Sequence, residues 1–152
     1  MGSITRPGAA LGILFGINVL NYLDRYVTGG MLPLIIGDLG ISDGQAGALQ
    51  SVFIFVYAFA SPVAGWLGDR VRRIPVATIG VIGFCLATFG SGLSTGFASL
   101  LLFRALVGVG EASYAVVSPS LISDYYPAER RIKALALFYA ATPIGTAIGF
   151  ML

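Results

Sequence analysis

The 152-residue chain is 57% hydrophobic, contains 21 glycines, and carries only 11% charged residues with a formal net charge of +2. A typical soluble domain has about 25% charged residues, so this composition excludes a soluble enzyme, a disulfide-rich secreted protein and a disordered tail. The small net charge also argues against nucleic-acid binding. We therefore predict an integral, multi-pass membrane protein.

The hydrophobic residues form long blocks instead of alternating with polar residues. A hydrocarbon core of about 30 Å requires roughly 20 apolar residues per helix. The predicted membrane spans are residues 9–36, 44–67, 75–93, 97–122 and 132–152. This pattern predicts an all-α bundle of five transmembrane helices.

The chemistry available to such a chain is limited. It has no histidine, and its single cysteine, Cys85, lies inside an apolar block. The sequence shows no P-loop, no nucleophile–base pair and no metal-ligand spacing. We expect no enzyme activity, no cofactor and no metal, and any proton chemistry must use carboxylates because the usual proton carrier, histidine, is missing.

The basic residues indicate the orientation. Seven of the nine lie before the first span, between the second and third, or after the fourth, and the two loops on the other side contain none. These seven are Arg6, Arg70, Arg72, Arg73, Arg130, Arg131 and Lys133. By the positive-inside rule, the N-terminus and both basic loops are expected to be cytoplasmic, in a plasma or inner membrane.

Two spans, the first and the fourth, contain charged residues far from their ends. The first carries Asp24 and Arg25, and the fourth carries Arg104 and Glu111. A charge at the bilayer centre costs about 2.5 to 3.5 kcal/mol on insertion scales, so each is a candidate functional residue. Charged helices at positions one and four also suggest a repeated three-span unit, as in many transporters.

Helical periodicity extends each pair of charges into a polar stripe. Asn18, Asn21 and Thr28 share an arc of about 120° with Asp24 and Arg25. Gly108, Tyr114 and Ser118 share a similar arc with Arg104 and Glu111. We predict that Asn18, Asn21, Thr28, Tyr114 and Ser118 line a cavity or contact substrate.

The charges have two interpretations. They could be structural ion pairs that hold two helices in register. Alternatively, they form a proton-responsive gate in which protonation of a carboxylate releases its arginine and shifts the conformational balance. We favour the gate, because a single pair would suffice for structure and because the polar stripes extend beyond the charges.

The loop after the second span carries a recognisable motif. Residues 65–73 read G-W-L-G-D-R-V-R-R, which resembles the G-x-L-[AG]-D-R-x-x-R signature of the major facilitator superfamily. In the fourth span, R-x-x-x-G-x-G-E-A at residues 104–112 is similar to a second signature of that superfamily. The resemblance implies that Gly65, Gly68, Asp69, Arg70 and Arg73 belong to a cytoplasmic gate.

A finer resemblance indicates a subgroup. N-Y-L-D-R at residues 21–25 and G-E-A-S-Y at residues 110–114, followed by Pro119, look like the spinster group of lipid transporters. This implies a lysophospholipid or phosphorylated sphingoid base as substrate, protons as a coupling partner, and Asp24, Arg25, Arg104 and Glu111 as coupling and gating charges. A rival within the superfamily is the group of proton-coupled sugar-acid symporters.

Members of the superfamily have twelve spans, so residues 1–152 correspond to part of the first six-helix half. We expect these residues to be one piece of a longer transporter and to need its remainder as a partner. A five-span membrane fragment that acts only in assembly or regulation is the alternative.

Asp124 and Glu129 follow the fourth span, and either could pair with Arg72 or Arg73 in the gate. The neighbouring tyrosines could instead form an ordinary interfacial aromatic belt.

Overall fold

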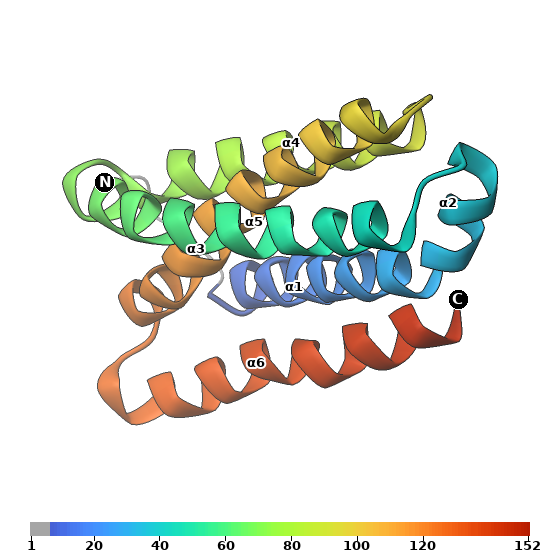
Figure 1. Ribbon diagram of the computed structural model, residues 1–152. Helices are drawn as coiled ribbons and strands as arrows, with labels where there is room; N and C mark the ends of the chain where they lie inside the picture. The colour runs from blue at the N-terminus through green and yellow to red at the C-terminus, as the bar shows by residue number, and fades with distance from the viewer. Residues whose placement is uncertain (1–6) are drawn as a thin grey trace. The chain divides into compact units, whose positions relative to one another are not determined.

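A computed structural model describes residues 7–152, so Arg6 lies outside the described residues. Within this range the chain is helical and contains no strand, which confirms the predicted all-α class (Figure 1). The helices are α1 (Pro7–Gly30), α2 (Leu32–Leu39), α3 (Asp43–Arg70), α4 (Arg73–Gly92), α5 (Phe97–Tyr125) and α6 (Ala128–Met151).

Four of the predicted spans correspond to α3, α4, α5 and α6, and among the described residues these four are long and apolar enough to cross a membrane. The prediction of one continuous first span over residues 9–36 is wrong. The chain turns at Met31 and continues as α2, which has Pro33 in its first turn. Proline lacks an amide hydrogen, so it suits the start of a new helix better than the interior of a long one.

The described residues divide into two compact units. The first unit comprises residues 7–30 and 118–152, and the second comprises residues 31–117. Helix α5 contributes to both units, since its residues 97–117 belong to the second and its last turns to the first.

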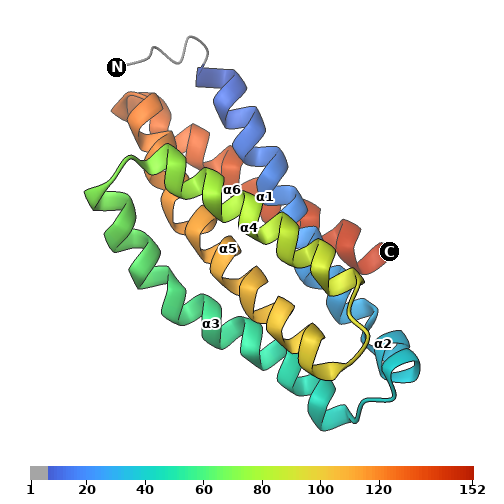
Figure 2. The same ribbon diagram turned by 90° about the horizontal axis from the view of Figure 1, so that it is seen from above.

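In the first unit, α1 and α6 lie side by side (Figure 2). The contact is close because two glycines of α6 face the α1 backbone. A β-carbon at Gly145 would lie 2.5 Å from the carbonyl oxygen of Val19, and one at Gly149 would lie 2.8 Å from that of Leu23. Only glycine allows this approach, as is common at helix–helix contacts in membranes.

In the second unit, α5 packs closely on both α3 and α4. A β-carbon at Gly108 would lie 3.0 Å from the carbonyl oxygen of Phe53 on α3. On the α4 side, one at Gly110 would lie 2.6 Å from the amide nitrogen of Phe84, and one at Gly80 would lie 2.9 Å from the carbonyl oxygen of Gly110. Small residues therefore set the spacing of these helices as well.

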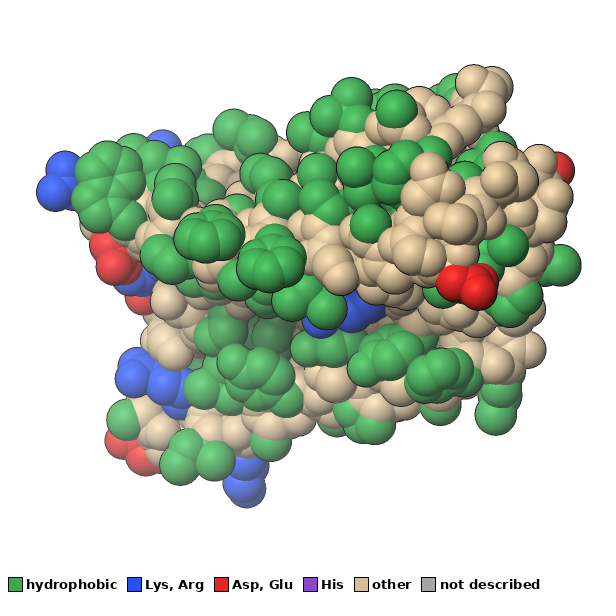
Figure 3. All heavy atoms as spheres, in the orientation of Figure 1, with side chains coloured by type: hydrophobic (Ala, Val, Ile, Leu, Met, Phe, Trp, Pro, Cys, Tyr) green, Lys and Arg blue, Asp and Glu red, His purple; other side chains and the backbone are tan. Residues whose placement is uncertain are grey.

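The helices present large hydrophobic side chains outward. Phe59, Ile79 and Phe89 are 74%, 70% and 69% exposed, and hydrophobic side chains cover much of the face shown in Figure 3. A water-soluble monomer rarely exposes apolar patches of this extent. The surface fits contact with lipid, as expected for an integral membrane protein.

Candidate functional site

Among residues 7–152, the polar stripe of α5 holds the most deeply buried polar side chains. Arg104 is 2% exposed and Glu111 is 1% exposed. Gly108, Tyr114 and Ser118, which the helical wheel places on the same face, are also buried. With a rise of 1.5 Å per residue, Arg104 and Glu111 lie about 10 Å apart along the helix axis. The stripe thus contains one basic and one acidic side chain, and both are buried.

Within the second unit, α3 covers the arginine end of this stripe. The guanidinium carbon of Arg104 lies 5.3 Å from the centre of the Phe53 ring. That ring in turn lies 6.0 Å from the ring of Tyr57. A cation over an aromatic face is stabilised by about 2 kcal/mol or more when it is desolvated. Phe53 therefore contacts Arg104 through a cation–π interaction, a role that the sequence did not reveal.

The α1 stripe is held differently. Asn18 and Asn21 are each 4% exposed, whereas Asp24 and Arg25 are only partly buried. The Asn18 side-chain amide donates a hydrogen bond of 3.1 Å to the carbonyl oxygen of Phe138 on α6. This bond gives Asn18 a helix-packing role in addition to the predicted one in lining a cavity, which stays a prediction.

Two further contacts shape the charged part of α1. The Thr28 hydroxyl donates a 3.0 Å hydrogen bond to the carbonyl oxygen of Asp24. The guanidinium carbon of Arg25 lies 5.2 Å from the centre of the Tyr22 ring. Asp24 and Arg25 therefore each have a contact with another residue of α1, Thr28 and Tyr22 respectively. Their role in proton coupling stays a prediction.

The gate motif lies at the connection between α3 and α4. Arg73 Nη2, at the start of α4, lies 3.6 Å from Asp69 Oδ1, near the end of α3. A β-carbon at Gly68 would lie 2.9 Å from the Val117 side chain, so this glycine also allows close approach to α5. The guanidinium carbon of Arg70 lies 4.3 Å from the centre of the Trp66 ring. The motif thus combines an exposed ion pair with a tightly packed helix end.

At the other basic loop, Arg131 Nη2 donates a 3.0 Å hydrogen bond to the carbonyl oxygen of Ser123. This bond ties the start of α6 to the last turn of α5, and sequence reasoning missed it. Asp124 is exposed near this turn. Its predicted pairing with Arg72 or Arg73 stays a prediction.

The predicted site residues are divided between the two units. Arg104, Gly108, Glu111 and Tyr114 share the second unit with the gate motif, whereas the α1 stripe and Ser118 belong to the first unit. The predicted pairing of α1 charges with α5 charges stays a prediction. Within residues 7–152, no cluster of three His, Cys, Asp or Glu side chains could hold a metal ion.

The chain is similar to proteins of known family. The family model described as Major Facilitator Superfamily matches residues 14–152. Protein spinster homolog 1 of Xenopus laevis is 43% identical over 91% of the chain and 27% of its own length. The Homo sapiens protein of the same name is 42% identical over 96% of the chain and 28% of its own length.

Among solved structures, the chain resembles a bacterial homolog to the human lysosomal transporter Spinster, in an inward-facing and occupied conformation. The two share 32% identity with a TM-score of 0.91 over 97% of this chain and 32% of the other. An inward-facing, unoccupied structure of a bacterial Spinster homolog gives a TM-score of 0.89 at 33% identity, over 97% of this chain and 31% of the other. The chain thus spans less than a third of the length of these proteins.

Proposed function

Because the chain belongs to the major facilitator superfamily and is of the spinster type, we propose that it forms part of a secondary active transporter that works by alternating access. Residues 1–152 would supply most of the N-terminal six-helix half, and the rest of the transporter would supply the opposite wall of the cavity. In transporters of this kind, substrate and ion sites lie near the bilayer midplane between repeats.

The observation that carries this proposal is the burial of Arg104 and Glu111 on one face of an otherwise apolar helix. Buried ionisable residues in a membrane are costly and mark ion pathways and relays. Protonation of Glu111 would change the stripe from balanced to net positive. Asp24 on α1 is a second carboxylate that could respond to pH. We propose that proton binding at one or both carboxylates biases the transporter between its inward- and outward-facing states.

The proposed substrate is an amphipathic lipid such as a lysophospholipid or a phosphorylated sphingoid base. Support comes from the similarity to spinster proteins at about 40% identity and from the G-E-A-S-Y stretch of α5. The Asp69–Arg73 pair would belong to the cytoplasmic gate, with the N-terminus and the two basic loops in the cytoplasm. The membrane is proposed to be a plasma or inner membrane.

The test uses the full-length protein that contains this chain, reconstituted in lipid vesicles under an imposed proton gradient. We expect uptake of radiolabelled lysophosphatidylcholine to exceed that of protein-free vesicles and to fall to their level when a protonophore dissipates the gradient. Unlabelled lysophospholipid should compete, and glucuronate should not.

The other outcomes discriminate between the alternatives. Competition by glucuronate alone would replace the lipid with a sugar acid while keeping the proton-coupled mechanism. Uptake that ignores the proton gradient would overturn the coupling proposal. Absence of transport of both substrates, by protein that remains folded, would favour a role in assembly or regulation.

A further inference from the structure

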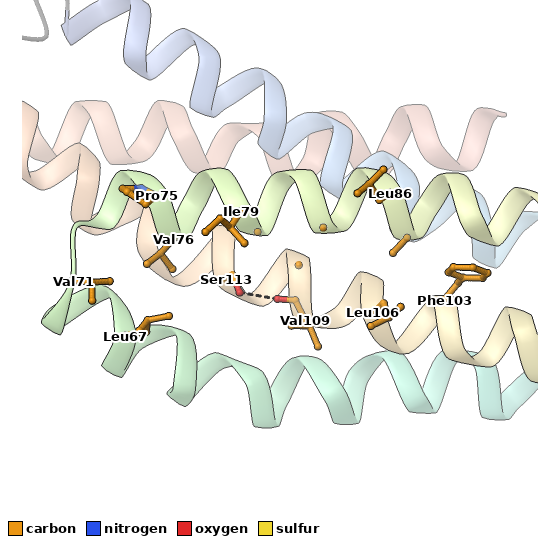
Figure 4. Close-up of a pocket in the computed structure, with 14 residues that line it drawn as sticks. Leu67, Val71, Pro75, Val76, Ile79, Leu86, Phe103, Leu106, Val109 and Ser113 are labelled. Atoms are coloured by element: carbon orange, nitrogen blue, oxygen red, sulfur yellow. Dashed lines mark hydrogen bonds between the residues drawn. The ribbon is translucent and has the colours of Figure 1, made fainter.

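An apolar groove of about 540 Å³ opens on the second unit along α3, α4 and α5 (Figure 4). Its one serine, Ser113, donates its hydroxyl to the carbonyl oxygen of Val109 at 2.9 Å, so that hydroxyl is already engaged. Six of the large hydrophobic side chains in its wall are exposed: Leu67, Val71, Ile79, Leu86, Leu106 and Val109. A groove of this lining favours a hydrocarbon occupant.

The length of the groove matches one leaflet of a bilayer. Its α4 wall runs from Pro75 to Ala87, which is about 18 Å at 1.5 Å per residue. Half of a hydrocarbon core of about 30 Å is about 15 Å. An acyl chain that enters from one membrane surface would therefore extend along most of the groove.

One end of the groove adjoins the basic connection between α3 and α4. Leu67, Val71 and Pro75 line that end, and the intervening connection carries three arginines against one acid, Asp69. Arg73 lies beside Asp69, whereas Arg70 lies over the Trp66 ring. Arg72 is exposed. Figure 3 shows both Lys or Arg and Asp or Glu side chains at the end where α3 meets α4. The positive charge lies where a phospholipid entering this groove would place its headgroup.

We propose that the groove binds one acyl chain of an anionic phospholipid whose phosphate contacts Arg70 and Arg72. Basic residues at the membrane surface attract anionic headgroups, each contributing about fivefold in affinity. The apolar wall supplies the site for the chain, and the arginines select the headgroup. This site depends on membrane insertion and is independent of the transport proposal.

The experiment uses the full-length protein in phosphatidylcholine vesicles that contain a trace of phosphatidylglycerol with a photoreactive diazirine on one acyl chain. The same diazirine chain on phosphatidylcholine is the reference probe. After illumination, mass spectrometry measures the labelling of α4 and α5 peptides. We expect at least about fivefold more labelling by phosphatidylglycerol, since even one arginine contributes that factor.

Two variants separate the chain site from the headgroup site. Gly83 lines the groove and has open space around it, so Gly83→Leu should fill the groove without a clash and remove most of the labelling. Gly47→Leu, at an equally open position outside the groove, is the matched control. Joint replacement of Arg70 and Arg72 by Gln should reduce the phosphatidylglycerol preference to near one, while Gln at both Arg130 and Lys133 should leave it unchanged.

Equal labelling by the two probes in the unaltered protein would overturn the headgroup assignment. Unchanged labelling in Gly83→Leu would overturn the groove as the site of the acyl chain. Absence of lipid labelling at α4 and α5, with cross-links to a second copy or to the remainder of the polypeptide, would show that protein covers the groove and would overturn the proposal.

Discussion

The polar stripes of α5 and α1 look alike in sequence but are built differently. On α5 the arginine and the glutamate are both buried, and glycines at positions 108 and 110 bring neighbouring backbones close. On α1 the two charges are only partly buried, the glycines that permit close approach lie on the partner helix α6, and Asn18 bonds to that helix.

This difference separates two uses of polar residues in a membrane helix. A buried side-chain amide that donates a hydrogen bond to the backbone of a neighbouring helix has its polar group paired, and the bond also holds the two helices together. A buried charge has a larger desolvation cost, so its retention points to a role in ion movement. The comparison therefore predicts that α1 asparagines matter first for stability and that α5 charges matter first for coupling.

The largest stability effect is expected for Gly145→Leu in α6. The added side chain would meet the carbonyl oxygen of Val19, and a backbone atom cannot rotate aside. Overpacking typically costs about 1–3 kcal/mol, and we expect the upper end of that range here. Thermal unfolding of the detergent-solubilised full-length protein measures it. Gly12→Leu, where the position is open, should change the unfolding temperature little; equal destabilisation by both would refute the close α1–α6 contact.

A smaller effect is expected for Asn18→Leu. This change replaces the polar amide with a branched apolar side chain and removes the bond to Phe138. Interhelical hydrogen bonds in membrane proteins contribute about 0.6 kcal/mol on average. The same unfolding measurement tests this value, with Ser51→Ala as control because the Ser51 hydroxyl bonds within its own helix. A loss of transport without any loss of stability would assign Asn18 to the cavity instead.

The smallest stability effect is expected for Asp69→Asn. The Asp69 side chain is 77% exposed and lies 3.6 Å from Arg73, and exposed ion pairs typically contribute about 0.2–1 kcal/mol. We expect a change in unfolding free energy near the lower end of that range together with a change in transport rate. A large loss of stability with an unchanged rate would show that the motif acts in folding and not in gating.

The positions of most helices along the sequence could be predicted because long apolar segments indicate contact with lipid. The predicted span 97–122 lies inside α5 at Phe97–Tyr125, and the wheel's polar face on α5 is buried throughout. The break at Met31 escaped prediction because membrane helices tolerate glycine and proline, so Gly30 and Pro33 did not identify a helix end.

The tertiary parts of the site could not be predicted. The cover of Phe53 over Arg104 and the bond from Arg131 to Ser123 join residues far apart in sequence or at a loop. A helical wheel reports which side of a helix is polar but does not identify the neighbour that it meets. The Gly145-x-x-x-Gly149 spacing was the one available signal for the close α1–α6 contact.

The most direct test of proton coupling at Glu111 compares Glu111→Gln with Asp38→Asn in the reconstituted full-length protein. Asp38 is an exposed carboxylate of α2. Proton-driven accumulation and substrate exchange without a gradient are measured on the same vesicles. We expect Glu111→Gln to lose accumulation but keep exchange, and Asp38→Asn to keep both. Full accumulation by Glu111→Gln, or a failure to fold with no separate transport defect, would contradict the coupling role of Glu111.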